Sequence, residues 1–105
     1  LFTNLLQNAI EAIPENRRGQ ILINETMENG QISISIRDNG SGIPAEMQSK
    51  IFTPNFTTKT SGTGLGLAMS KGIVEQARGD IWFETSEGKG TTFYIRFPLH
   101  QPEAI

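Results

Sequence analysis

The chain of 105 residues contains no cysteine. Disulfide bonds, thiolate metal sites and cysteine nucleophiles are therefore excluded. Its residues show no signal-peptide pattern and no apolar run close to the roughly 20 residues that a membrane-spanning helix needs. A net charge of −2 leaves no basic surface to indicate nucleic acid or an anionic membrane as a general partner. These absences predict a cytoplasmic domain outside the membrane, which is compatible with a parent protein anchored in the inner membrane.

The length allows one domain with one modest core. Apolar periodicity predicts helices over 2–13 and 65–78, and Pro44 precedes a short third helix at 45–50. Alternation with a period of two predicts strands over 20–27, 31–38, 80–86 and 90–97, joined in pairs by Gly-containing turns. This order predicts a two-layer α/β (α+β) sandwich, in which helices cover one face of a mixed, mostly antiparallel sheet.

The predicted helix 65–78 has an apolar face and a glycine at its end. Leu65, Met69, Gly72 and Ile73 share one side of it and form its predicted apolar face. Gly79 is expected to end it.

Asp38 has the parity of the isoleucines in the strand 31–38, so its carboxylate is predicted to point toward the helices. A carboxylate in that position is costly unless a donor satisfies it, and the amino group of adenine is a suitable donor. Gly40 and Gly42 would let a flat ring approach the backbone. The alternative is an ordinary Asp-Gly turn.

Thr91 is predicted to lie on the same side as Asp38, because it shares the parity of Phe93 and the other apolar residues of the last strand. Its hydroxyl can bond adenine or a water beside it. Trp82 and Tyr94 are predicted to point to the opposite face.

The segment 62–67, Gly-Thr-Gly-Leu-Gly-Leu, opens the second long helix. Bare glycine amides and a helix N-terminus together favour an anion such as a phosphate. The segment is neither a Walker A loop nor a dinucleotide fingerprint. A Gly-rich linker is the alternative, although the apolar Leu65 and Leu67 argue against it. Lys59 precedes the segment and is either a solvated lysine or a clamp for the γ-phosphate.

Asn4 and Asn8 lie four residues apart, so they share one face of the first helix. They are either solvent-facing polar residues or part of a face for metal and phosphate. Mg²⁺ takes oxygen ligands, and a neutral amide suits a site where a triphosphate supplies the negative charge. Phe52 and Phe56 are aromatic residues around a polar loop. They are interpreted as satellite core residues, as a hinge that packs when a lid closes over a ligand, or as both.

In this order, the segments resemble the N, G1, F, G2 and G3 boxes of the sensor histidine kinase catalytic domain: NLLQNAIEA, DNGSG, IFTPNFTTK, GTGLGL and GKGTTF. This domain has a Bergerat-type ATP site, shared with type II topoisomerases, mismatch-repair ATPases and heat-shock chaperones. The resemblance runs from Asn4 to Pro98. It implies an ATP-binding catalytic domain over 1–98, without the family's first strand and the start of its first helix, and a tail at 99–105. The absence of a helix cap before Leu1 also predicts a fragment.

The resemblance also implies roles for individual residues. Asn8 would bind Mg²⁺, Asp38 the adenine amino group, and Thr91 would lie near the purine. Asn4 stands where the hydrolytic relatives carry a glutamate that activates water; an amide accepts no proton, so transfer is favoured over hydrolysis. The remaining binding residues implied for ATP are Gly40, Gly42, Ile43, Phe52, Phe56, Lys59, Gly62, Thr63, Gly64, Leu65, Gly66 and Leu67, with a lid over about residues 44–63.

The implied activity is that of a protein-histidine kinase. The γ-phosphate of ATP would pass to a histidine on a separate dimerisation domain of the parent protein, with a response regulator receiver domain downstream. The fragment alone is expected to be inactive, because His100 lacks the neighbours typical of the acceptor. Glu11 stands where many histidine kinases carry a lysine near the phosphates, and Asn55 replaces an aromatic residue that is common in the F box. An ATPase clamp, an anti-sigma-type serine kinase and a module that binds without transfer are the alternatives.

Overall fold

The computed structural model describes residues 2–53 and 66–98 of the chain. The helices are α1 (Phe2–Glu11), α2 (Ala45–Gln48) and α3 (Gly66–Gln76). The strands are β1 (Ile21–Glu28), β2 (Gln31–Asp38), β3 (Asp80–Ser86) and β4 (Gly90–Pro98). These bounds lie within a few residues of the predicted ones. Within the described ranges, no helix has the length and apolar character that crossing a membrane requires.

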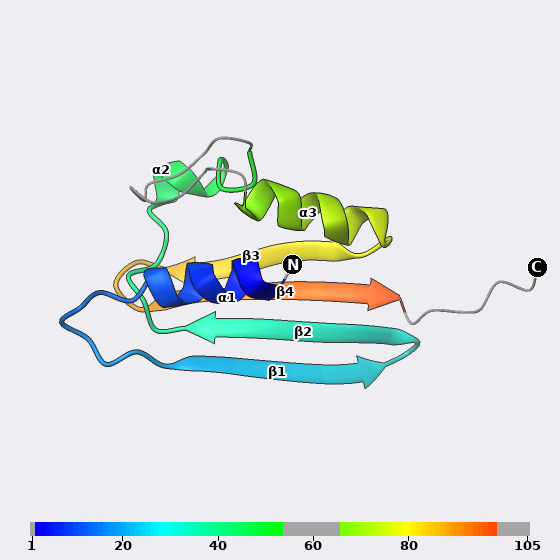
Figure 1. The fold of residues 1–105 in the computed structure, drawn as a ribbon, viewed down its shortest axis with the longest axis horizontal. Helices are drawn as coiled ribbons and strands as arrows, with labels where there is room; N and C mark the ends of the chain where they lie inside the picture. Colours follow the sequence, from blue (N-terminus) through cyan, green and yellow to red (C-terminus); the bar gives the residue numbers. More distant parts are fainter. Residues whose placement is uncertain (1, 54–65, 99–105) are drawn as a thin grey trace, which may run out of the picture.

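The strands form one sheet in the order β1-β2-β4-β3, and α1 and α3 lie over the same face of it (Figure 1). The predicted two-layer α/β sandwich is confirmed. The sheet, expected to be mixed and mostly antiparallel, is antiparallel in each of its described strand pairs. The β1–β2 hairpin turns at Asn29 and Gly30, whose φ values of 53° and 75° explain the Asn-Gly sequence.

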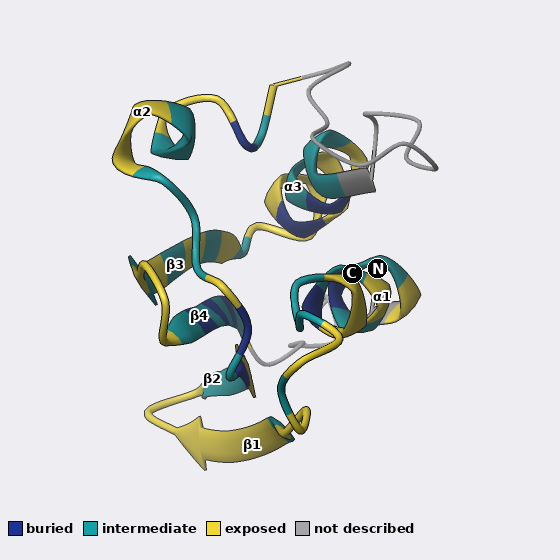
Figure 2. Ribbon diagram, turned by 90° about the vertical axis from the view of Figure 1, so that its left-hand side faces the viewer, coloured by how far each residue is buried: buried dark blue, intermediate teal, exposed yellow. Residues whose placement is uncertain are grey.

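The core lies between the helices and the inner face of β2 and β4 (Figure 2). Ile36 stands opposite Phe93 in the register of these two strands. Burial decreases toward the edge strand β1 (Figure 2), and Met27, which is paired with Ile32 of β2, is 67% exposed. The buried apolar residues are Leu5, Ala9, Ile36, Ile51, Val74, Phe93 and Ile95.

The apolar face predicted for α3 is wrong. Met69 and Ile73 are 55% and 43% exposed, whereas Ser70 and Val74 are fully buried. The buried face of α3 includes the polar Ser70, so it does not appear as an apolar stripe in the sequence. The apolar residues that were used for the prediction, Met69 and Ile73, lie on the outer side of the helix.

The end of α3 also differs from expectation. The helix ends at Gln76, and the left-handed residue after it is Arg78, with a φ of 64°. The N–H of Gly79 donates to the carbonyl of Val74 at 2.9 Å. A Cβ on Gly79 would overlap the carbonyl oxygen of Arg96, so glycine is needed here for close packing on β4.

Candidate functional site

Asp38 is the last residue of β2, and its side chain is 97% buried, with 3% exposed. Its Oδ1 accepts the backbone N–H of Gly40 at 2.8 Å and that of Thr91 at 3.2 Å. Such donors offset the cost of removing a carboxylate from water. The structure therefore confirms the predicted orientation and holds the carboxylate at the end of the sheet where β2 stops and β4 starts (Figure 1).

Arg17 and Asn39 hold one side of the loop that follows Asp38. Nη1 of Arg17 donates to the carbonyl oxygens of Asn39 and Gly40 at 2.7 and 2.8 Å. The Asn39 side chain accepts the N–H of Gln20 and donates to the carbonyl of Arg18, both at 2.8 Å. The loop after Asp38 is thus hydrogen-bonded to residues 17–20, which precede β1.

The end of α1 and the β3–β4 hairpin hold the other side of this loop. The N–H of Ser41 donates to the carbonyl of Ala12 at 3.0 Å. The carbonyl of Ser41 accepts the N–H of Gly88 at 2.7 Å. The loop therefore connects a helix end to a hairpin that lies far along the chain.

Gly40 and Gly42 lie where these segments approach most closely. A Cβ on Gly40 would stand 2.5 Å from the carbonyl oxygen of Ala12. Gly42 has a φ of 79°, and its Cβ would stand 2.5 Å from the carbonyl oxygen of Ser86. Protein backbone fills the side of each glycine that a side chain would occupy. These glycines are thus required for loop packing, and their place beside a purine stays a prediction.

Gly90 lies in the GKGTTF segment, but the sequence analysis predicted no role for it. It has a φ of 138°, and a Cβ on it would overlap the carbonyl oxygen of Asp38. Its position directly before Thr91 was the available signal, but the close approach depends on how β2 and β4 end relative to each other.

Thr91 is 4% exposed, and the structure confirms that it lies on the same side as Asp38. Its Oγ1 is 2.9 Å from Oγ1 of Thr85, its register partner in β3. Thr85 Oγ1 also accepts the N–H of Ile43 at 2.9 Å and lies 3.1 Å from the carbonyl oxygen of Gly90. Sequence analysis missed Thr85, although its parity in 80–86 places it on the inner face.

Asn4 and Asn8 are half-buried on α1, which does not fit fully solvent-facing positions. Asn8 lies about one helical turn before Ala12, and Asn4 about two turns before it. Because Ala12 bonds the loop after Asp38, this face of α1 is anchored to the same junction. α1 also contacts α3, which begins at Gly66 and packs the partly buried Leu67 against the core.

Phe52 packs at the margin of the core, as one of the two interpretations predicted. Its ring centroid is 6.1 Å from that of Phe83 and 6.3 Å from that of Phe93, in tilted and edge-on arrangements. Nζ of Lys71 lies 5.6 Å from the Phe52 ring centroid. Several other predicted residues, with the histidine of the tail, lie outside the described residues: Phe56, Lys59, Gly62, Thr63, Gly64, Leu65 and His100.

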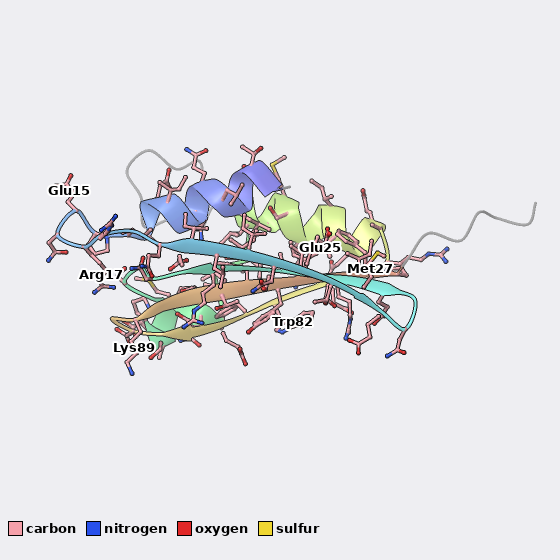
Figure 3. All side chains as sticks on the ribbon, turned by 90° about the horizontal axis from the view of Figure 1, so that it is seen from below. Glu15, Arg17, Glu25, Met27, Trp82 and Lys89 are labelled. Atoms are coloured by element: carbon pink, nitrogen blue, oxygen red, sulfur yellow. The ribbon has the colours of Figure 1, made fainter. Side chains whose placement is uncertain are left out.

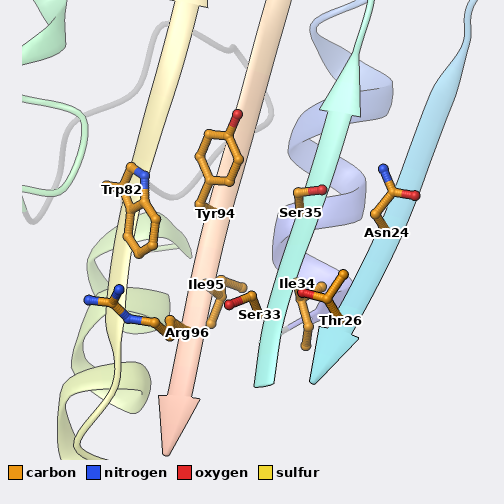
Figure 4. Close-up of a pocket in the computed structure, with 9 residues that line it drawn as sticks. All are labelled: Asn24, Thr26, Ser33, Ile34, Ser35, Trp82, Tyr94, Ile95 and Arg96. Atoms are coloured by element: carbon orange, nitrogen blue, oxygen red, sulfur yellow. The ribbon is translucent and has the colours of Figure 1, made fainter. Parts of the chain in front are cut away.

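A hollow on the opposite face of the sheet is separate from this junction (Figure 4). Trp82 stacks on Tyr94 there, with centroids 5.4 Å apart and an interplanar angle of 15°. The guanidinium carbon of Arg96 lies 5.3 Å from the Trp82 centroid. Trp82 points away from the helices (Figure 3), as predicted. None of the predicted site residues lines this hollow.

Comparison with known proteins places this geometry in a family. Residues 1–101 match the family described as histidine kinase-, DNA gyrase B- and HSP90-like ATPase. The chain is 39% identical to sporulation kinase E of Bacillus subtilis over 96% of its length. It is 45% identical to the sensor histidine kinase ZraS and 47% identical to the signal transduction histidine-protein kinase AtoS, both of Escherichia coli, over 95% of its length. The chain spans only 14% to 21% of the length of these three relatives.

Solved structures of histidine kinases have the same fold. The nucleotide-free catalytic domain of the histidine kinase ThkA superposes with a TM-score of 0.77 at 45% identity, covering 90% of this chain and 61% of that one. The mycobacterial sensor histidine kinase MprB gives 0.78 at 27% identity, covering 90% and 67%. The fold is that of a catalytic ATPase domain of the sensor histidine kinase type. The chain belongs to the histidine kinase-, DNA gyrase B- and HSP90-like ATPase family, and this membership implies ATP binding.

Proposed function

We propose that the junction around Asp38 binds the adenine of Mg-ATP, and that the domain supplies the γ-phosphate to a histidine on a separate dimerisation domain of its parent protein. The observation that carries this proposal is the buried Asp38 carboxylate, fixed by the N–H groups of Gly40 and Thr91. An ionised carboxylate only accepts hydrogen bonds, so it suits the amino group of adenine. Ile43 and Gly42, on the loop beside it, would border the ring.

The donor chemistry of the described residues fits a magnesium ion that arrives with a triphosphate. Among residues 2–53 and 66–98, no three His, Cys, Asp or Glu side chains gather as a metal site. A cation near the amide of Asn8 would therefore take its other oxygen ligands from phosphate and water, as Mg²⁺ commonly does. The bound ion would neutralise phosphate charge, while Asn8 would hold it beside α3, whose first residue is Gly66.

Asn4 supports transfer over hydrolysis. It is half-buried one turn before Asn8 on α1, and its amide does not act as a general base. Transfer between a positioned nucleotide and an imidazole depends on alignment and charge neutralisation. We infer that the acceptor histidine lies elsewhere in the parent protein, that a response regulator receives the phosphoryl group, and that this domain is cytoplasmic with a parent anchored in the inner membrane.

Calorimetry with Mg-ATP tests the binding part of this proposal. The unchanged chain is expected to bind, and Asp38→Asn to lose most of the affinity, because an amide placed there also presents donors to the purine. Asp80→Asn is the matched control, since Asp80 is an exposed carboxylate on the opposite face whose partner is Arg96. Equal binding by Asp38→Asn and the unchanged chain would refute the assignment of adenine to this junction.

Phosphotransfer is tested on the parent protein with labelled ATP. Label that is stable to alkali and lost in acid indicates a phosphorylated histidine, as expected. Acid-stable label on a serine of a partner would support the serine kinase alternative. Rapid release of free phosphate without protein labelling would support an ATPase clamp.

A further inference from the structure

The Thr85 hydroxyl joins three segments of the candidate site. It accepts the N–H of Ile43 from the loop after Asp38 at 2.9 Å. It lies 2.9 Å from the hydroxyl of Thr91 and 3.1 Å from the carbonyl oxygen of Gly90, both in β4. Thr85 is itself half-buried in β3, so the packed sheet holds its position.

A hydroxyl has one hydrogen, so Thr85 can donate to only one of its two acceptors in β4. If it donates to Gly90, the hydroxyl of Thr91 can donate to Thr85, and all three groups are satisfied. If it donates to Thr91 instead, the Gly90 carbonyl loses this bond. The first arrangement therefore makes one more hydrogen bond in a part-buried place, where unsatisfied groups are costly. In that arrangement the Thr91 hydroxyl has only lone pairs, and no hydrogen, left for a further partner.

We propose that Thr85 is a positioning residue that makes Thr91 a hydrogen-bond acceptor toward the purine. This inference rests on the proposed function, because it requires the purine of ATP to lie beside Asp38 and Thr91. Two acceptors, the Asp38 carboxylate and the Thr91 hydroxyl, would then face the 6-substituent, one for each hydrogen of an amino group. Such a pair favours a 6-amino group, which donates, over a 6-oxo group, which does not. Thr85 thereby contributes to selectivity for adenine over 6-oxopurines.

The test compares the affinities of the full chain for Mg-ATP and Mg-ITP. These nucleotides differ in the 6-substituent and in N1, which is an acceptor in adenine and an N–H donor in hypoxanthine; the N1 difference is the same for every variant. Thr85→Val keeps the shape of the side chain but removes the hydroxyl, so the Thr91 hydrogen is released and can donate to a 6-oxo group. The preference for ATP over ITP is expected to fall about tenfold, as for one mispaired hydrogen bond. Thr85→Ser retains the hydroxyl and is expected to retain the preference. Thermal unfolding confirms that each variant is folded.

A structural role alone would weaken both nucleotides equally and leave the preference unchanged, and that result would overturn the inference. If Thr85→Val does not fold, Thr85→Cys makes the same comparison, because a thiol is a weak donor and acceptor; an unchanged preference there also overturns it. Failure of the unchanged chain to bind Mg-ATP would overturn the proposed function and this inference together. Binding that Asp38→Asn abolishes, with a preference unaffected by Thr85→Val, would overturn the inference alone.

Discussion

The carboxylate of Asp38 and the backbone N–H of Thr91 meet at 3.2 Å across 53 positions of the sequence. This bond joins the end of β2 to the start of β4, and the N–H of Gly40 adds a second donor at 2.8 Å. The position of the carboxylate consequently depends on the β3–β4 hairpin as well as on its own strand. Changes in that hairpin are expected to act on nucleotide binding without touching a nucleotide.

Gly90→Ala is expected to show this dependence. Its Cβ would overlap the carbonyl oxygen of Asp38, at a backbone φ of 138° that side chains rarely adopt. Strain and overpacking together are expected to lower the free energy of unfolding by about 3 kcal/mol. Urea denaturation measures the loss, and calorimetry should show weaker Mg-ATP binding, because relief of the overlap moves Asp38.

Gly88→Ala is the matched control in the same hairpin. Gly88 also has a left-handed φ, 82°, but a Cβ there meets nothing within 4 Å. Only the conformational cost of about 1 kcal/mol is expected, with Mg-ATP binding retained. Equal losses of stability in the two variants would show that overlap with Asp38 is not the cause.

Arg17→Met is expected to loosen the loop between Asp38 and Ser41. Methionine keeps much of the aliphatic stem but loses the donors to the carbonyls of Asn39 and Gly40. For a half-buried charged donor we expect a loss of about 1–2 kcal/mol in unfolding free energy. Arg18→Met is the control, because the exposed Arg18 side chain makes no such bonds and its carbonyl still accepts from Asn39. A similar loss in both variants would contradict the role of Arg17.

Parity within a strand predicted the face of the sheet on which Asp38 and Thr91 lie. Because side chains alternate strictly, Asp38 and Thr91 could be placed on the helix-covered face without knowing how their strands pair. The helices and strands followed from the same local signals. The sensor histidine kinase resemblance rested on short segments in a fixed order, and the comparisons confirmed it.

The contacts of Arg17 and Thr85 could not be predicted from local sequence patterns. Arg17 lies in an irregular segment, and its two acceptors are 22 and 23 residues away. The role of Thr85 depends on the register that puts it opposite Thr91 and on the loop path that brings Ile43 to it. The buried side of α3 was missed for another reason, since Ser70 is a polar residue at a core position.

Gly72→Ala is expected to stabilise the domain. Gly72 lies inside α3 on its exposed side, and an added Cβ meets nothing within 4 Å. Alanine restricts the unfolded chain and favours the helix, so the unfolding free energy should rise by about 0.5–1 kcal/mol. Gly79→Ala is the contrasting variant, expected to destabilise because its Cβ overlaps the Arg96 carbonyl. Urea denaturation of both variants separates helix propensity from packing; a loss of stability in Gly72→Ala would contradict the prediction.

Tyr94 is expected to give the domain a specific sensitivity to alkaline pH. Its hydroxyl donates to Oε1 of Glu84 at 2.7 Å. This bond, together with partial desolvation and the negative charge of Glu84, raises the pKa of Tyr94 above its ordinary value of 10.0, while Arg37 opposes the shift. A raised pKa means that the protonated phenol is favoured by folding. Its contribution to stability is therefore complete below about pH 10 and is lost as pH rises through the folded-state pKa.

The measurement is the urea midpoint of the unchanged chain and of Tyr94→Phe between about pH 9 and about pH 11. Tyr94→Phe lacks the phenol, so it serves as the reference for every other effect of alkaline pH. The unchanged chain should lose more, because only it gives up the bond to Glu84. Glu84→Gln is the control: it removes the charge that raises the pKa, and its pH dependence should lie between the other two. Parallel curves for the unchanged chain and Tyr94→Phe would mean that the bond to Glu84 does not couple phenol ionisation to folding.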